Sequence, residues 1–129
     1  MVIADTSVWI SFFNRPTSVE KRVLDILIDS DEVVMAGIVL AELLQGCRTS
    51  KERDALKETL LALPYVEMTH SVWIRTGETS SVLLRRGITL PIPDLIVASI
   101  ALEQQFHLYS LDNHFQKIQG LALYTPSIA

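Results

Sequence analysis

The chain has little of several features that define particular protein classes. Its 129 residues include one cysteine, Cys47, which excludes an internal disulfide and a zinc site built from cysteines. Glycine and proline number five each, which excludes a collagen-like or low-complexity chain. The longest apolar run, residues 95–102, is far shorter than the ~20 residues of a membrane helix. Residues 1–5 lack the basic start and long apolar stretch of a secretion signal, so we expect a cytoplasmic protein that does not bind membranes.

Positive charge is also scarce. Lys and Arg number 11 against 15 Asp and Glu, which gives a net charge of −4. This acidic balance argues against a protein that coats nucleic acid by bulk electrostatics. Hydrophobic residues nevertheless make up 49% of the chain, so a compact core is expected, and the length suits one domain. We therefore expect a single domain over residues 1–129.

Short β-type apolar runs alternate with helical patterns along the whole chain. The expected strands are residues 1–4, 33–35, 65–69, 106–110 and 121–124. The expected helices are residues 8–13, 19–28, 38–45, 53–63, 71–86 and 94–105, with a short helix at 113–118. Such alternation predicts the α/β class, with a central, mostly parallel sheet covered by helices on both faces as an α/β/α sandwich.

Four acidic residues stand apart from the others. Most acids lie beside basic residues, as on a solvated surface, but each of these four is the sole charged residue, with histidine counted as neutral, in a long and largely apolar stretch. They are Asp5 in 1–14, Glu42 in 33–47, Asp94 in 87–102 and Asp112 in 104–116. Ionised carboxylates are costly to remove from water, so acids in core-like segments require cations, backbone donors or an opening to solvent.

The expected positions of these acids favour a shared site. Asp5 and Asp112 follow predicted strands, Asp94 lies at or near a helix start, and Glu42 lies inside a helix. The carboxyl edge of a parallel sheet is where ligands bind in open α/β folds. Carboxylates without cysteine or histidine suit Mg²⁺ or Mn²⁺ rather than zinc. Helix capping is the alternative for Asp5, Asp94 and Asp112, but a mid-helix glutamate has no capping role.

Four segments, in order, resemble the motifs of PIN-domain nucleases, and in particular the VapC toxins of bacterial VapBC toxin-antitoxin pairs. They are Val2-Ile3-Ala4-Asp5-Thr6-Ser7, Val39-Leu40-Ala41-Glu42-Leu43-Leu44-Gln45-Gly46, Pro93-Asp94-Leu95-Ile96-Val97-Ala98 and Leu108-Tyr109-Ser110-Leu111-Asp112-Asn113-His114-Phe115. The resemblance extends over nearly the whole chain. It implies a PIN-like fold, a metal-dependent endoribonuclease that leaves a 5′-phosphate, a VapB-like antitoxin as partner and a homodimer.

The resemblance also implies roles for individual residues. The four solitary acids match the acidic residues that hold Mg²⁺ or Mn²⁺ and carry catalysis: Asp5, Glu42, Asp94 and Asp112. Thr6 or Ser7 matches a hydroxyl that supports the first aspartate, and Ser110 stands where the family often has threonine. Asn113, beside the fourth acid, is a candidate for orienting it.

Other residues receive plainer interpretations. Arg15 and Arg48 lie just beyond helices associated with the acidic motifs, which makes them candidate RNA contacts. His70, His107 and His114 lack the spacing of a zinc helix and are expected to be structural or exposed. Two other functions remain open at this stage: a housekeeping nuclease of the same fold and a non-catalytic acidic α/β module that binds a protein. A phosphotransfer protein with aspartates at strand ends would need a second aspartate near Asp5 or a well-placed lysine after a later strand, and neither appears.

Overall fold

The computed structural model describes residues 1–127, so the expected domain of residues 1–129 extends two residues beyond the described part. Four strands form one parallel sheet in the order β3-β2-β1-β4. They are β1 (Val2–Ala4), β2 (Val33–Ala36), β3 (Tyr65–Val66) and β4 (His107–Tyr109). β1 lies in the middle, with Ile3 paired to Val34 on one side and to Leu108 on the other. The expected α/β class and parallel sheet are confirmed.

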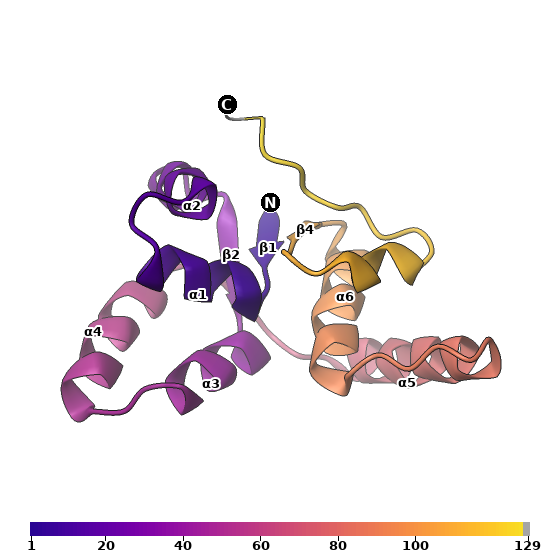
Figure 1. Cartoon of the computed structure of the whole chain (residues 1–129). Coiled ribbons are helices and arrows are strands. Elements are labelled where there is room, and N and C mark those ends of the chain that lie inside the picture. Colours follow the sequence, from indigo (N-terminus) through magenta and orange to yellow (C-terminus); the bar gives the residue numbers. More distant parts are fainter. Residues whose placement is uncertain (128–129) are drawn as a thin grey trace.

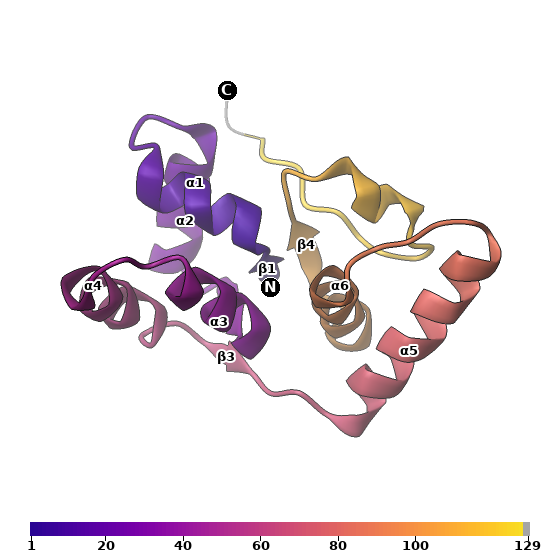
Figure 2. The ribbon, with the colours of Figure 1, turned by 60° about the horizontal axis from the view of Figure 1, so that its bottom comes forward.

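Six α-helices flank the sheet, and a 3-10 helix, η1 (Asn113–Lys117), follows β4. In both ribbon views α1–α4 gather on one side of the strands and α5 and α6 on the other, as an α/β/α sandwich requires (Figures 1 and 2). None of the helices within residues 1–127 is long and apolar enough to cross a membrane. The α-helices are α1 (Thr6–Asn14), α2 (Val19–Asp29), α3 (Gly37–Gln45), α4 (Ser50–Leu60), α5 (His70–Arg85) and α6 (Ile92–Gln104).

Local sequence signals explain where the helices begin and end. Ser18, Thr49 and Thr69 accept backbone N–H groups as N-caps of α2, α4 and α5. α6 instead begins with a proline in its first turn, where the missing N–H costs nothing. α5 ends before Gly87, whose φ of +76° suits glycine. These signals place the helix starts within a few residues of the sequence predictions.

The strand predicted at residues 65–69 is wrong in extent. β3 covers only two of these residues, because its partner β2 ends at Ala36 and turns directly into α3 at Gly37. A side chain at Gly37 would meet the Tyr65 hydroxyl at 2.8 Å, so the exposed Tyr65 ring would have to shift to admit one. β3, the edge strand that pairs with β2, is therefore only two residues long.

The strand predicted at residues 121–124 is also wrong in extent. These residues form only an isolated parallel bridge, between Leu123 and Leu108. The Tyr124 N–H donates to the Leu108 carbonyl at 2.8 Å. Because donors on one side of a strand recur at every second residue, the next would come from Pro126, which has no N–H, and the ladder cannot continue.

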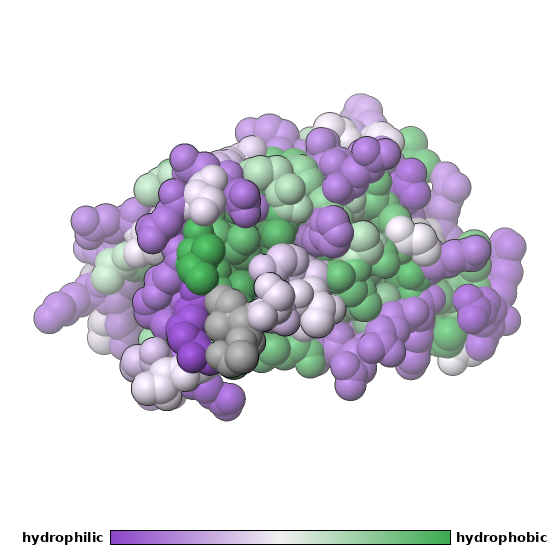
Figure 3. Space-filling view, turned by 90° about the horizontal axis from the view of Figure 1, so that it is seen from above, coloured by the Kyte–Doolittle hydropathy of each residue, from purple (hydrophilic) through white to green (hydrophobic). Residues whose placement is uncertain are grey.

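The hydrophobic core lies between the sheet and the helix layers on either side of it. Trp9 of α1, Leu95 of α6 and Phe115 of η1 are fully buried there. Seen from above, the face at which β1 begins has apolar surface toward its middle and polar residues along much of its margin (Figure 3). β1 points away from this face in Figure 1, so the carboxyl ends of the strands lie on the opposite side.

Candidate acidic centre

The structure brings the four solitary acids to the carboxyl edge of the sheet. Asp5 follows β1 directly, Asp94 lies in the first turn of α6, Asp112 precedes η1 and Glu42 lies within α3. Figure 2, in which this edge comes forward, shows the starts of α1, α3 and α6 and the loop after β4 arranged around the end of β1. The topology of a parallel sheet therefore gathers residues that lie up to 107 positions apart in the chain.

Electrostatics shows that these acids act on one another. Burial raises the pKa of Asp94 above its ordinary value of 3.8, and the charges of Asp5, Asp112 and Glu42 raise it further. His114 acts in the opposite direction on the same pKa. Three carboxylates thus disfavour the charge on a fourth, which is the situation that a bound cation relieves.

Asp5 is the most enclosed of the four, with 4% of its surface exposed. The Ser7 hydroxyl donates to its Oδ1 at 2.5 Å, the Val8 N–H donates to the same oxygen at 3.3 Å, and the Ser110 hydroxyl donates to Oδ2. Burial raises the pKa of Asp5, while these three donors act to lower it and the charge of Asp112 raises it. Asp5 therefore does cap α1, but both of its oxygens are also occupied by hydroxyl donors.

The same two hydroxyls also hold the loop that carries Asp112. The Leu111 N–H donates to Ser7 Oγ at 3.1 Å, and the Asp112 N–H donates to Ser110 Oγ at 2.9 Å. Each serine hydroxyl thus accepts a hydrogen bond from a loop amide and donates one to an oxygen of Asp5. We call Asp5, Ser7 and Ser110 the carboxylate clasp; it fixes the loop backbone beside Asp112 relative to β1.

Glu42 has a different hydroxyl partner. The Thr6 hydroxyl donates to its Oε1 at 2.6 Å, a contact between residues 36 positions apart. The sequence left open whether Thr6 or Ser7 supports the first aspartate; in the structure Ser7 contacts Asp5, and Thr6 contacts Glu42. Adjacent residues at the start of α1 therefore orient two different carboxylates.

His114 is the residue of this region that sequence reasoning missed. Its Nε2 lies 3.0 Å from Asp94 Oδ2, an ion-pair contact when the imidazole is protonated. This buried nitrogen makes no regular hydrogen bond within residues 1–127, so its contact with Asp94 is purely electrostatic. Nothing in the spacing links His114 to Asp94, twenty positions earlier; the contact arises only because η1 lies beside the start of α6.

The exposure of Asp112 corrects the expectation that all four acids lie in buried segments. Asp112 lies at the surface rather than in a core-like setting, because β4 ends at Tyr109 and the chain leaves the sheet before reaching it. It occupies the N-cap position of η1 without a side-chain capping bond. Asn113 is exposed and makes no side-chain hydrogen bond within the described residues. Its proposed role in orienting Asp112 stays a prediction.

The four acids fit a divalent cation in donor chemistry and in charge. Their oxygens are the hard ligands that Mg²⁺ and Mn²⁺ prefer, and no lysine or arginine pairs with any of them in residues 1–127. No group of three or more Asp, Glu, His or Cys side chains among these residues is already close enough to share an ion. Hydroxyl donors and His114 instead occupy several of the oxygens in the metal-free arrangement.

A pH dependence follows for the metal-free protein. Because folding raises the pKa of Asp94, its contribution to stability is full below the unfolded pKa and is lost as the pH rises through the folded pKa. We expect the free energy of unfolding of the wild type, minus that of Asp94→Asn, to fall as the pH rises above the ordinary aspartate pKa of 3.8. Urea unfolding of both proteins in EDTA measures this difference. A difference that increases with pH would contradict the buried, repelled carboxylate described above.

The two arginines predicted to contact RNA lie at the ends of helices. Arg15 follows α1 and Arg48 follows α3, and both are exposed. Neither arginine lines the cavity of about 510 Å³ at α1 and α3, but their chain neighbours Asn14 and Cys47 do, together with Glu42. This placement does not test the prediction that Arg15 and Arg48 contact RNA.

The fold and the acidic edge define a class: α/β/α proteins that carry a carboxylate site where the strands of a parallel sheet end. The model of the PIN domain family matches residues 2–121, and the chain belongs to this family. The resemblance noted from the four motifs is thereby confirmed. A comparison with curated protein sequences gives no match.

Solved structures with the same fold include several from bacterial VapBC systems. VapBC2 from Rickettsia felis, bound to a DNA fragment from its promoter, is 23% identical, with 96% of this chain and 98% of that chain covered and a TM-score of 0.79. VapBC-1 from nontypeable Haemophilus influenzae is 23% identical, with coverage of 96% and 97% and a TM-score of 0.77. VapC20 from Mycobacterium tuberculosis, a toxin that cleaves the sarcin-ricin loop, is 16% identical, with coverage of 98% and 100% and a TM-score of 0.69. At these identities the likeness shows a shared fold.

Proposed function

We propose that this PIN-domain chain is a Mg²⁺- or Mn²⁺-dependent endoribonuclease and the toxin of a toxin-antitoxin pair. The observation that carries the proposal is the convergence of Asp5, Glu42, Asp94 and Asp112 on one edge of the sheet, where three of them raise the pKa of the fourth. The family match and the VapBC fold neighbours support it. A metal-free acidic surface would repel RNA, so the site suits phosphate only when a cation is held there.

In this proposal the four acids hold the metal, and the hydroxyls orient them. A divalent ion so held supplies a water made nucleophilic at neutral pH and charge compensation on the phosphate, with expected products that carry a 5′-phosphate and a 3′-hydroxyl. The carboxylate clasp fixes both oxygens of Asp5 and the loop beside Asp112. Thr6 fixes Glu42, and His114 contacts Asp94. These contacts orient individual carboxylates; because no three acidic side chains within residues 1–127 are close enough to share an ion, binding of the metal would bring the acids closer together.

The proposed partner is a VapB-like antitoxin. The Rickettsia and Haemophilus neighbours are VapBC structures, which supports such a partner for a chain with this fold. The cavity of about 510 Å³ between α1, α3 and α4 combines apolar residues with two acids, Glu42 and Glu52. Such a groove suits an amphipathic segment with basic residues. The homodimer, the cytoplasmic location and the single domain over residues 1–129 belong to the same proposal.

Cleavage of RNA by the purified chain tests the proposed activity. We expect a mixed-sequence RNA to be cut in Mg²⁺ or Mn²⁺, to stay intact in EDTA, and to be cut again when excess Mg²⁺ is restored. Analysis of the RNA ends should show 5′-phosphates. Cleavage that persists at full rate in EDTA would contradict the metal-dependent mechanism, and a chain that leaves a broad panel of RNAs intact in both ions would contradict the ribonuclease assignment.

A further inference from the structure

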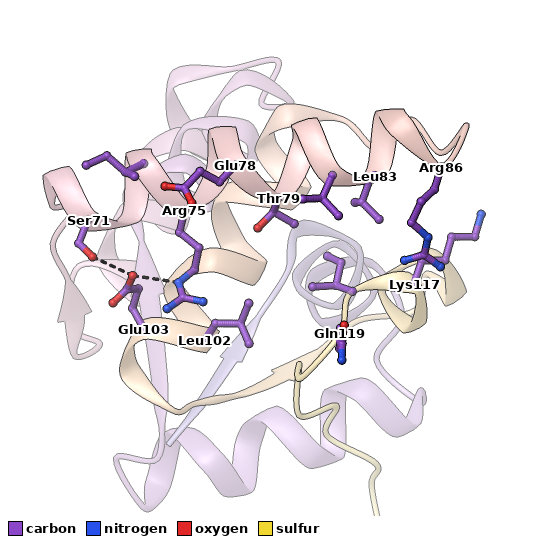
Figure 4. A pocket seen from close by; sticks show the side chains of 13 residues that line it. Ser71, Arg75, Glu78, Thr79, Leu83, Arg86, Leu102, Glu103, Lys117 and Gln119 are labelled. Carbon is purple, nitrogen blue, oxygen red and sulfur yellow. Dashed lines mark hydrogen bonds and ion pairs between the residues drawn. The ribbon is translucent and has the colours of Figure 1, made fainter.

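A second cavity lies away from the four acids. It has a volume of about 480 Å³ and lies between α5, the end of α6 and η1 (Figure 4). Its apolar lining includes Leu83, Leu102 and Ile118, of which Leu83 and Ile118 are buried. A cavity of this size and mixed lining is large enough for one nucleotide-sized group.

The charges around this cavity are unevenly distributed. At one end Glu103 accepts hydrogen bonds from Ser71 at 2.8 Å and from Arg75 Nε at 2.9 Å, so its charge is compensated. These bonds lower the pKa of Glu103. Arg86 and Lys117 both line the other end of the cavity (Figure 4), and neither forms an ion pair within residues 1–127. Glu78 also lines the cavity, but it lies beside Arg75 (Figure 4), so the end with Arg86 and Lys117 has two cations and no acid, which favours an anion there.

The helix dipole alone does not account for this pair. A cation near the C-terminus of α5 is stabilised by that dipole, and this explains Arg85 and Arg86 equally. It does not explain why Arg86 rather than Arg85 lines the cavity, or why Lys117 comes to the same end from a different element. The pairing is a property of the tertiary structure.

η1 connects this basic end to the acidic edge. Asp112 is the N-cap of η1, and Lys117 is its last residue. A 3-10 helix rises about 2 Å per residue, so the two backbones lie about 10 Å apart. Successive phosphates of a stacked strand advance about 3.4 Å along its axis, so this separation corresponds to about three nucleotides.

We propose that Arg86 and Lys117 bind a backbone phosphate of the RNA, about three nucleotides from the bond that is cut. The inference rests on the proposed function and adds the path of the strand: along η1 toward α5, and away from the groove that contains Glu42 and Glu52. The apolar lining of the cavity contacts the sugar or base attached to that phosphate. RNA is favoured over an acidic peptide because the basic end is joined to the proposed cleavage site by one short element.

The test compares Arg86→Ala/Lys117→Ala with Arg85→Ala. The control removes a neighbouring cation that does not line the cavity. We expect the double variant to raise KM for an oligonucleotide about tenfold and to reduce the salt dependence of kcat/KM by about 0.7 in log–log slope, the value for one single-strand phosphate. The control should remain within about twofold of the wild type. Thermal unfolding in both variants checks that the fold is kept.

Substrate length gives an independent readout. The effect of the double substitution should disappear for oligonucleotides shortened on one side of the cleavage site so that they end before the third nucleotide. A double variant that matches Arg85→Ala on long substrates, while the wild type cleaves RNA, overturns the inference alone. A change in oligomeric state instead of KM also overturns it, because the cavity is then a protein interface. If the wild type neither binds nor cleaves RNA, the proposed function fails and the inference fails with it.

Discussion

Asp94→Asn is expected to reduce RNA cleavage in Mg²⁺ by at least about 10³-fold, since losing a metal ligand removes several kcal/mol of transition-state stabilisation. Asp94 is the cleanest single test among the four acids because no backbone group depends on its side chain for a hydrogen bond in the described residues. Asp5, by contrast, holds the clasp and the loop beside Asp112. The double variant Asp5→Asn/Asp94→Asn should abolish cleavage.

Glu58→Gln is the matched control for these substitutions. Glu58 is exposed on α4, a helix that carries none of the four acids, yet its replacement changes the net charge by the same amount as Asp94→Asn. We expect its cleavage rate to stay within about twofold of the wild type, as for an ordinary surface substitution. Single-turnover rates at saturating Mg²⁺ measure the chemistry. Wild-type turnover by a folded Asp5→Asn/Asp94→Asn protein would contradict the assigned metal ligands.

Phe115→Ala is expected to lower the free energy of unfolding by about 3–5 kcal/mol, the usual cost of emptying a buried phenylalanine site. Phe115 is fully buried within η1, so it anchors the element that carries His114 and ends at Lys117. Losing this anchor should also weaken Mg²⁺ binding, because Asp112 immediately precedes η1. Urea unfolding with and without Mg²⁺ measures both effects.

Phe115→Leu is the control that keeps an apolar side chain at this position. It should cost less than half as much stability as Phe115→Ala, because the remaining cavity is smaller. If Phe115→Ala unfolds at the wild-type urea concentration, the proposed anchoring of η1 is wrong. If both variants lose stability equally, the effect depends on the aromatic ring rather than on filled volume.

The sequence predicted the helices and the sheet class well because local signals specify them. Ser18, Thr49 and Thr69 cap helices as their residue types indicate, and the alternation of elements led to the parallel sheet. The strand expected at residues 121–124 failed because pairing depends on a partner edge as well as on apolar residues. Within residues 1–127 these residues pair only with Leu108, and the next donor in register would be Pro126, which has no N–H.

The candidate site was predictable in composition and not in its contacts. The pattern of solitary acids in apolar stretches selected Asp5, Glu42, Asp94 and Asp112, because burying an uncompensated charge is costly. The structure places Asp112 at the surface, so for this residue the apolar stretch did not indicate burial. The division of hydroxyls between Thr6 and Ser7 depends on which side of α1 faces α3, a tertiary property. The contact between His114 and Asp94 likewise requires the packing of η1 against α6.

The scarcity of positive charge takes on a different meaning once the site is located. Without the four acids, 11 acidic residues remain against 11 basic ones, so the excess of −4 equals the charge of the proposed centre. The rest of the protein is balanced. An acidic chain can therefore act on RNA if phosphate is held through metal ions at that centre and through local cations such as Arg86 and Lys117.

Thermal unfolding with increasing Mg²⁺ tests the central claim, that the four acids form one metal centre, without requiring a known RNA target. Ligand at 100 times its Kd stabilises a folded protein by about 2.7 kcal/mol, which corresponds to a rise in Tm of roughly 10 °C for a domain of this size. We predict such a rise for the wild type and for Glu58→Gln, and none for Asp5→Asn/Asp94→Asn. An equal rise in all three proteins, or no rise in the wild type, would contradict the account.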